Sequence, residues 1–185
     1  MEEGFLGPAM NNVSFEKHNR ILIIGNSGSG KSWLAGILSL HLGIEQTSLD
    51  KMNWEPGGFF KEKDELIVQV ELEELSQKPN WIIEGVYGNL AEIILPKATH
   101  FFWLDLDSKF CVESVKARGF DHIEMLDTEV KINGYLNHIK SYFSNSGPMS
   151  REFHQYLFNQ SFIDKRKFTS RDEVNEFCDG LNSKS

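Results

Sequence analysis

The chemistry of this chain is concentrated in eight residues that match the phosphate-binding pattern G-x-x-x-x-G-K-[ST] at every position. In order, they are Gly25, Asn26, Ser27, Gly28, Ser29, Gly30, Lys31 and Ser32. Glycine permits backbone angles that other residues avoid, so the loop can turn successive N–H groups toward a phosphate chain. The Lys31 ammonium suits the β- and γ-phosphates of a nucleoside triphosphate, and the Ser32 hydroxyl suits Mg²⁺. The pattern therefore predicts a site for ATP and Mg²⁺.

A strand before this loop and a helix after it are needed to hold it in place. Residues 21–24, Ile-Leu-Ile-Ile, form a short apolar run that is typical of a buried strand. Residues 33–43 form an apolar, helix-competent segment that ends at Gly43. A helix beginning near Lys31 would direct unpaired N–H groups and its positive dipole end at the phosphates. This context favours a phosphate loop over a flexible glycine-serine loop, but it does not choose among kinases, GTPases, ATPases and motors.

Strand and helix signals alternate along the rest of the chain. Further strands are expected at 44–50, 81–85, 100–106 and 161–168, and the charged residues of the last one suit a sheet edge. Helices are expected between these strands and at 170–181, and the alternation predicts a mainly parallel α/β sheet that is covered on both faces. We expect a single domain over residues 19–185, a loosely ordered extension over 1–18 and a candidate lid over 119–150.

Acidic residues lie at or near the ends of three of the predicted strands, on the side where open α/β sheets bind ligands. Asp50 ends the second strand, Glu84 lies in the third and Asp105 ends the fourth. Glu84 is placed to contact Mg²⁺ directly or through water, and Asp105 is a second candidate for the metal site. Asp50 is a candidate to orient or deprotonate an acceptor hydroxyl. The alternatives are a loop-capping role for Asp50 and a solvated strand end for Glu84.

Two arginines flank the candidate lid. Phosphoryl transfer requires cations that stabilise the charge moving between donor and acceptor. Arg118 ends a predicted helix and Arg151 follows the irregular stretch, so both could move toward the phosphates when a lid closes. The alternative for Arg118 is a cation that interacts favourably with the helix dipole, and the alternative for Arg151 is an ordinary surface position.

Composition limits the location and the partners. The chain of 185 residues has a formal net charge of −8, which argues against a basic surface for nucleic acid. No apolar run approaches the length of a transmembrane helix, and the first 20 residues lack the apolar region of a secretory signal. The two cysteines, Cys111 and Cys178, show no metal-ligand spacing. We expect a cytoplasmic protein with reduced thiols, whose partners do not include membranes or nucleic acid.

Three segments and the phosphate loop together resemble a known family. The segments are SLDKMNWEPGGFF at 48–60, NWIIEGVYG at 80–88 and FFWLDLDSKFCVESVKARGF at 101–120. They resemble the small P-loop kinases related to adenylate kinase and, more narrowly, the group of DNA topology modulation proteins. That group has a leucine-aspartate, a tryptophan and a proline-glycine after the second strand, here Leu49-Asp50, Trp54 and Pro56-Gly57. Its next strand is tryptophan-isoleucine-isoleucine-acid-glycine with a tyrosine nearby, here residues 81–85 and Tyr87.

The resemblance implies a three-layer P-loop NTPase fold with a five-stranded parallel sheet, of the nucleoside- and nucleotide-kinase type, that binds ATP and Mg²⁺. It implies that Asp50 faces the acceptor site, that Glu84 belongs to the Mg²⁺ shell and that Arg118 begins the lid. Two features depart from the family. The family usually has aspartate at the position of Glu84, and its lid is rich in arginine, whereas residues 120–150 here contain lysines but no arginine.

These observations lead to one leading hypothesis and two rivals. The leading hypothesis is ATP-dependent phosphoryl transfer to a small molecule, in particular a nucleotide or nucleoside. Its catalytic candidates are Lys31, Asp50, Arg118 and Arg151, and its metal candidates are Ser32, Glu84 and Asp105. The first rival, which the arginine-poor lid favours, is a nucleotide-binding regulatory protein with little or no turnover. The second rival is an NTPase that releases phosphate without an acceptor.

Overall fold

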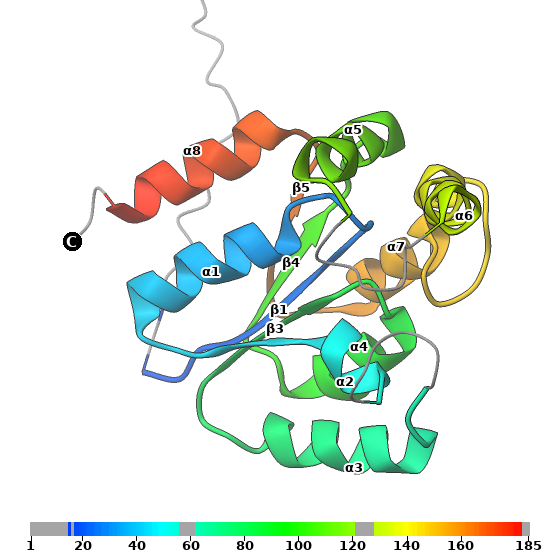
Figure 1. Ribbon diagram of the computed structural model, residues 1–185. Helices are drawn as coiled ribbons and strands as arrows, with labels where there is room; N and C mark the ends of the chain where they lie inside the picture. Colours follow the sequence, from blue (N-terminus) through cyan, green and yellow to red (C-terminus); the bar gives the residue numbers. More distant parts are fainter. Residues whose placement is uncertain (1–14, 16, 56–61, 121–127, 183–185) are drawn as a thin grey trace, which may run out of the picture.

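One parallel sheet organises the chain (Figure 1). The predicted site lies at the carboxyl ends of its strands. The computed structural model describes residues 15, 17–55, 62–120 and 128–182. The strands are β1 (Arg20–Gly25), β2 (Gln46–Ser48), β3 (Trp81–Gly85), β4 (His100–Leu104) and β5 (Asp164–Phe168). Their order is β2-β3-β1-β4-β5, and every neighbouring pair is parallel. The predicted α/β fold with a five-stranded parallel sheet is confirmed, and β5 lies at an edge as expected.

Helices cover both faces of this sheet, so that α1 and α8 lie on one side and α3 and α4 on the other (Figure 1). The helices are α1 (Lys31–Leu42), α2 (Leu49–Asn53), α3 (Glu65–Ser76), α4 (Gly88–Ile94), α5 (Ser108–Arg118), α6 (Glu129–Ser141), α7 (Arg151–Gln160) and α8 (Arg171–Asn182). A short 3₁₀ helix at Leu95–Lys97 follows α4. Within the described ranges, no helix combines the length and the apolar composition needed to cross a membrane.

The central strand β1 shows why the sheet is buried on both sides. Ile21 and Ile23 pack into the cluster beneath α1, α5, α6 and α8, whereas Leu22 and Ile24 pack into the cluster formed with α3, α4 and α7. All four side chains are fully buried. Because successive side chains of a strand point to opposite faces, an uninterrupted apolar run is the pattern expected of a strand covered on both faces.

One local expectation from the sequence is wrong. The second strand ends at Ser48 rather than Asp50, because the chain turns into α2 at Leu49 and the Leu49 side chain packs against Gly85 of β3. Helix α6 runs through the Asn-Gly pair at 133–134, with Leu136 and Ile139 buried. Residues 1–14 and 16 of the expected extension, and residues 121–127 of the candidate lid, lie outside the described residues.

Candidate active site

The loop between β1 and α1 has the backbone that a phosphate site requires. Gly25, Gly28 and Gly30 have φ angles of 153°, 82° and 96°, in the region that side chains disfavour. At Gly28 space is a second constraint, because a Cβ would meet the carbonyl oxygen of Cys111 on α5. The loop is therefore packed onto α5 at a distance that glycine alone allows.

Helix α1 begins directly after this loop, at Lys31. Gly30 is its N-cap residue, and no side chain caps the helix, so its first N–H groups are available to an anion. The Lys31 side chain is buried, and its Nζ donates to the backbone oxygen of Asn26 at 3.0 Å. This contact holds the ammonium against the loop, where it can exchange the carbonyl for phosphate oxygens.

The phosphate loop is also tied to a distant helix. The side chain of Asn26 is buried, and its Nδ2 donates to the backbone oxygen of Ile139 on α6 at 2.9 Å. Burial raises the pKa of Tyr135 on the same helix, and a hydrogen bond with the Ser27 side chain opposes this shift. Helix α6 lies within the candidate lid. It supports the phosphate loop through the side chain of Asn26, which bonds to its backbone, and through its own Tyr135 side chain.

Ser32 and Glu84 form the best candidate for a Mg²⁺ site. In the parallel register, Glu84 lies beside Ile23 of β1 and Ser48 of β2. Ser32 Oγ donates to Glu84 Oε1 at 3.1 Å, and Glu84 is buried. A hydroxyl and a carboxylate beside a phosphate loop suit Mg²⁺, which also takes oxygens from substrate phosphates and water. The described residues contain no cluster of three or more His, Cys, Asp or Glu that would hold a metal ion without such help.

Asp50 occupies the first turn of α2, next to the phosphate loop. Burial raises the pKa of Asp50, and the charge of Glu84 acts in the same direction, whereas Lys31 and a hydrogen bond from the Val86 N–H oppose the shift. Its Oδ1 atom is buried and has no hydrogen-bond partner among the residues that the structure describes. A buried carboxylate normally has its oxygens paired, so an unpaired one is a candidate to receive a substrate proton.

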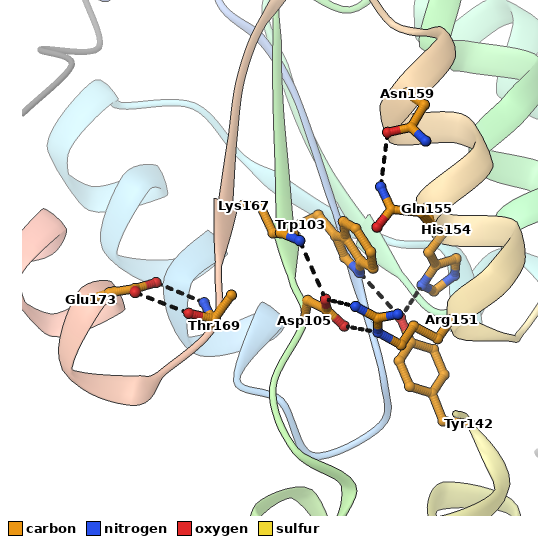
Figure 2. Close-up of polar contacts among 10 residues, drawn as sticks. All are labelled: Trp103, Asp105, Tyr142, Arg151, His154, Gln155, Asn159, Lys167, Thr169 and Glu173. Atoms are coloured by element: carbon orange, nitrogen blue, oxygen red, sulfur yellow. Dashed lines mark hydrogen bonds and ion pairs between the residues drawn. The ribbon is translucent and has the colours of Figure 1, made fainter. Parts of the chain in front are cut away.

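Asp105 and Arg151, predicted candidates for the metal site and for the transferring phosphoryl group, instead bind each other (Figure 2). Arg151 donates from Nε to Oδ1 at 2.8 Å and from Nη2 to Oδ2 at 2.7 Å. Lys167 Nζ lies 3.7 Å from Oδ2. Asp105 thus has both oxygens engaged by cations, and the Arg151 guanidinium is held in a two-point ion pair. This geometry differs from both sequence-based assignments and favours a structural role for the pair.

Arg118 lies beside the phosphate loop, in the wall of a cavity of about 240 Å³. The cavity is lined by Gly28, Gly30, Lys31, Ser32, Trp33, Phe110, Ser114, Arg118 and Arg171. Arg171 stacks on the Trp33 ring with its guanidinium carbon 4.0 Å from the ring centroid. Two arginines and two aromatic rings beside the loop suit the rest of a nucleotide.

A buried hydrogen-bond chain lies behind the site, and no pattern in the sequence predicted it. Trp103 Nε1 donates to Tyr142 Oη at 3.1 Å, and Tyr142 Oη lies 2.7 Å from His154 Nδ1 (Figure 2). His154 Nε2 lies 2.9 Å from the backbone oxygen of Val86. A neutral imidazole satisfies every member, with Nδ1 accepting from Tyr142 and Nε2 donating to Val86. These hydrogen bonds connect β4, the C-cap residue of α6 and α7 to Val86, whose N–H binds Asp50.

The hydrogen-bond chain through His154 predicts that the protein loses stability in acid. Burial lowers the pKa of His154 from 6.5 to about 4, so the unfolded state binds the proton more tightly than the folded state. The stabilising effect is complete above about pH 6.5 and is lost as the pH falls toward 4, at a cost of about 3 kcal/mol. Urea unfolding of the wild type and of His154→Gln, whose amide can keep both hydrogen bonds, should show a steeper acid loss for the wild type. Equal losses between pH 7 and 4.5 would contradict this role of His154.

The sheet order and the loop define a class of fold: the chain has the fold of the P-loop kinases. Shikimate kinase from Acinetobacter baumannii in complex with shikimate matches it with a TM-score of 0.55 and 16% identity, over 92% of this chain and 97% of that one. A gluconokinase from Sinorhizobium meliloti 1021 matches with a TM-score of 0.52 and 14% identity, over 89% and 92%. No protein-family model matches the sequence, and no curated protein matches it.

Proposed function

We propose that this chain is an ATP-dependent kinase that transfers the γ-phosphoryl group to a hydroxyl group of a small molecule. One observation carries the proposal: the buried Oδ1 atom of Asp50, which has no hydrogen-bond partner among the described residues, lies at the same end of the strands as the phosphate loop and the Ser32–Glu84 pair. A loop-capping aspartate would have its oxygens bonded to the backbone it caps. The fold shared with shikimate kinase and gluconokinase supports the same class of reaction.

In the proposed reaction, one set of residues binds the phosphate donor and another acts on the acceptor. Lys31 and the N–H groups of the loop bind the donor phosphates. Ser32 and Glu84 would hold Mg²⁺, whose chemistry is to neutralise the charge of those phosphates. The acceptor O–H gives its proton to Asp50, and the acceptor oxygen bonds to the γ-phosphorus. The bond from that phosphorus to the β–γ bridging oxygen then breaks, and ADP leaves with the electron pair.

Arg118 is the arginine that we assign to the transferring group. It lies beside the phosphate loop, and no acidic side chain pairs with it among the ion pairs of the described residues. The resemblance to adenylate kinase and to DNA topology modulation proteins supports a nucleoside or nucleotide as the acceptor. We also retain the expected single domain and the candidate lid at 119–150 as parts of this proposal.

The proposal is tested by supplying ATP and Mg²⁺ together with a panel of nucleosides, nucleoside monophosphates and sugars. ADP formation that depends on one acceptor, with the phosphorylated product identified by mass spectrometry, would support a kinase. Saturable ATP binding without ADP formation would favour the regulatory protein, for which the arginine-free segment 120–150 is the supporting observation. Phosphate release at the same rate with and without acceptors would favour the NTPase.

Glu84→Gln should raise the Mg²⁺ concentration needed for half-maximal activity by about tenfold. The amide can still accept the hydrogen bond from Ser32, but it lacks the negative charge that stabilises a bound cation. Initial rates measured across a Mg²⁺ titration provide the readout. Glu92→Gln, an exposed change on α4, is the matched control. An unchanged titration curve for Glu84→Gln would remove Glu84 from the metal site.

A further inference from the structure

Apart from Lys31 of the phosphate loop, the charged and aromatic side chains that act near Asp50 are two carboxylates, Glu84 and Glu62, and the rings of Tyr87 and Trp54. They set the charge that an acceptor can carry. The buried carboxylate of Glu84 acts on Asp50 from β3. Tyr87 follows β3, and the charges of Asp50 and Glu62 both act on its hydroxyl. With Mg²⁺ held by Glu84, an anionic acceptor at Asp50 would still meet the carboxylates of Asp50 and Glu62 in a partly buried site.

Two aromatic side chains are fixed beside these carboxylates. Trp54 Nε1 donates to Tyr87 Oη at 3.1 Å, and Asn53 also hydrogen-bonds to the Tyr87 hydroxyl. Burial, reinforced by Asp50, raises the pKa of Tyr87 to about 12, so the phenol stays neutral. The backbone holds the pair as well, because Trp54 forms an antiparallel bridge with Glu62. The result is an apolar surface with a neutral hydroxyl at its edge, which suits an uncharged ring.

Carboxylates and phosphates are recognised in buried sites mainly by arginine, and the five arginines of this chain are placed elsewhere. Arg20 starts β1 at the opposite end of the sheet, Arg118 lines the cavity beside the phosphate loop, Arg151 binds Asp105, Arg166 lies over Phe168 and Phe177, and Arg171 stacks on Trp33.

Lysines do not replace them among the described residues around Asp50. Lys31 belongs to the phosphate loop, Lys63 is paired with Glu71 at 2.9 Å, and Lys51 is exposed on α2.

We propose that the acceptor is an uncharged polyhydroxy compound, such as a sugar, a cyclitol or a nucleoside, and that the site discriminates against carboxylates and phosphates. This inference rests on the proposed kinase function and narrows its acceptor. Neutral hydroxyls can donate to Asp50 and hydrogen-bond with Tyr87 without adding a charge. Glucitol and a nucleoside fit this description, whereas gluconate, shikimate and nucleoside monophosphates do not.

The test compares acceptors in matched pairs that differ in charge: glucitol with gluconate, methyl shikimate with shikimate, and each nucleoside with its monophosphate. ADP formation gives kcat/KM for both members, and ³¹P NMR identifies the product. We expect the uncharged member to be preferred by at least about tenfold in every pair that is turned over. Equal values, or a preference for the anion, would overturn the inference and leave the kinase proposal standing. A complete lack of acceptor-dependent turnover would overturn both.

A charge reversal provides an independent check. Glu62→Lys places a cation beside Tyr87 and should raise kcat/KM for the anionic members by about fivefold relative to their neutral partners. Glu74→Lys makes the same change at an exposed site near the other end of α3 and should leave the ratio unchanged. An unaltered ratio in Glu62→Lys would show that these carboxylates do not select the acceptor.

Discussion

Lys31→Ala should lower acceptor-dependent ADP formation by at least about 100-fold while the protein stays folded. The Lys31 ammonium is the loop's own positive charge for the donor phosphates, and the described site offers no second lysine to replace it. In the fold itself the ammonium contributes a hydrogen bond to the Asn26 carbonyl, and losing it should cost about 1 kcal/mol. Initial rates and urea unfolding, measured on the same preparation, separate the two effects.

Lys78→Ala is the matched control for this variant. Lys78 is exposed in the turn after α3, and it lines a cavity that does not include the phosphate loop. We expect wild-type rates and wild-type stability from it. Full phosphoryl transfer by Lys31→Ala would refute the kinase proposal, because the loop would then not be the donor site.

Asp50→Asn should reduce kcat by about 100- to 10,000-fold, with little change in the KM for ATP. Asparagine has the same shape and can still accept from the Val86 N–H, but it cannot take the acceptor proton. The wild type should also lose activity as the pH falls through the raised pKa of Asp50, because a protonated carboxyl is no longer a base. The variant should lack this acidic limb.

Asp164→Asn, an exposed change at the start of β5, serves as the control for Asp50→Asn. A pH–rate profile for each protein is the decisive measurement. If Asp50→Asn kept both the wild-type kcat and the acidic limb, another group would have to be the base, and Asp50 would be a structural residue of α2.

The parts of the site that were predictable from sequence are those encoded locally. The phosphate loop is contiguous, and its glycines, its lysine and the flanking apolar runs place it between β1 and α1. Aspartate is a common N-cap residue, and Asp107 caps α5, because its Oδ1 accepts from the Lys109 N–H at 2.7 Å. Such features depend on residues only a few positions apart, where propensity and pattern are informative.

The rest depends on partners far apart in the chain. Asp105 and Arg151 are 46 residues apart, and each looked like a separate candidate until the fold joined them. His154 and Val86 are 68 residues apart, and no sequence pattern around either residue predicts their contact. The start of α2 at Leu49 likewise depends on Gly85, whose lack of a side chain makes room for Leu49. Contacts of this kind are set by packing, which overrides local preference.

The hydrogen bond from Asn26 to Ile139 bears on how tightly the loop can bind a nucleotide. It anchors the loop to α6, and α6 is itself anchored because Leu136 and Ile139 are buried in the core. A loop that is already fixed in its curled form loses little conformational entropy when phosphates arrive, so more of the contact energy is expressed as affinity. The donor site is therefore preorganised in part by a helix that lies more than a hundred residues further along the chain.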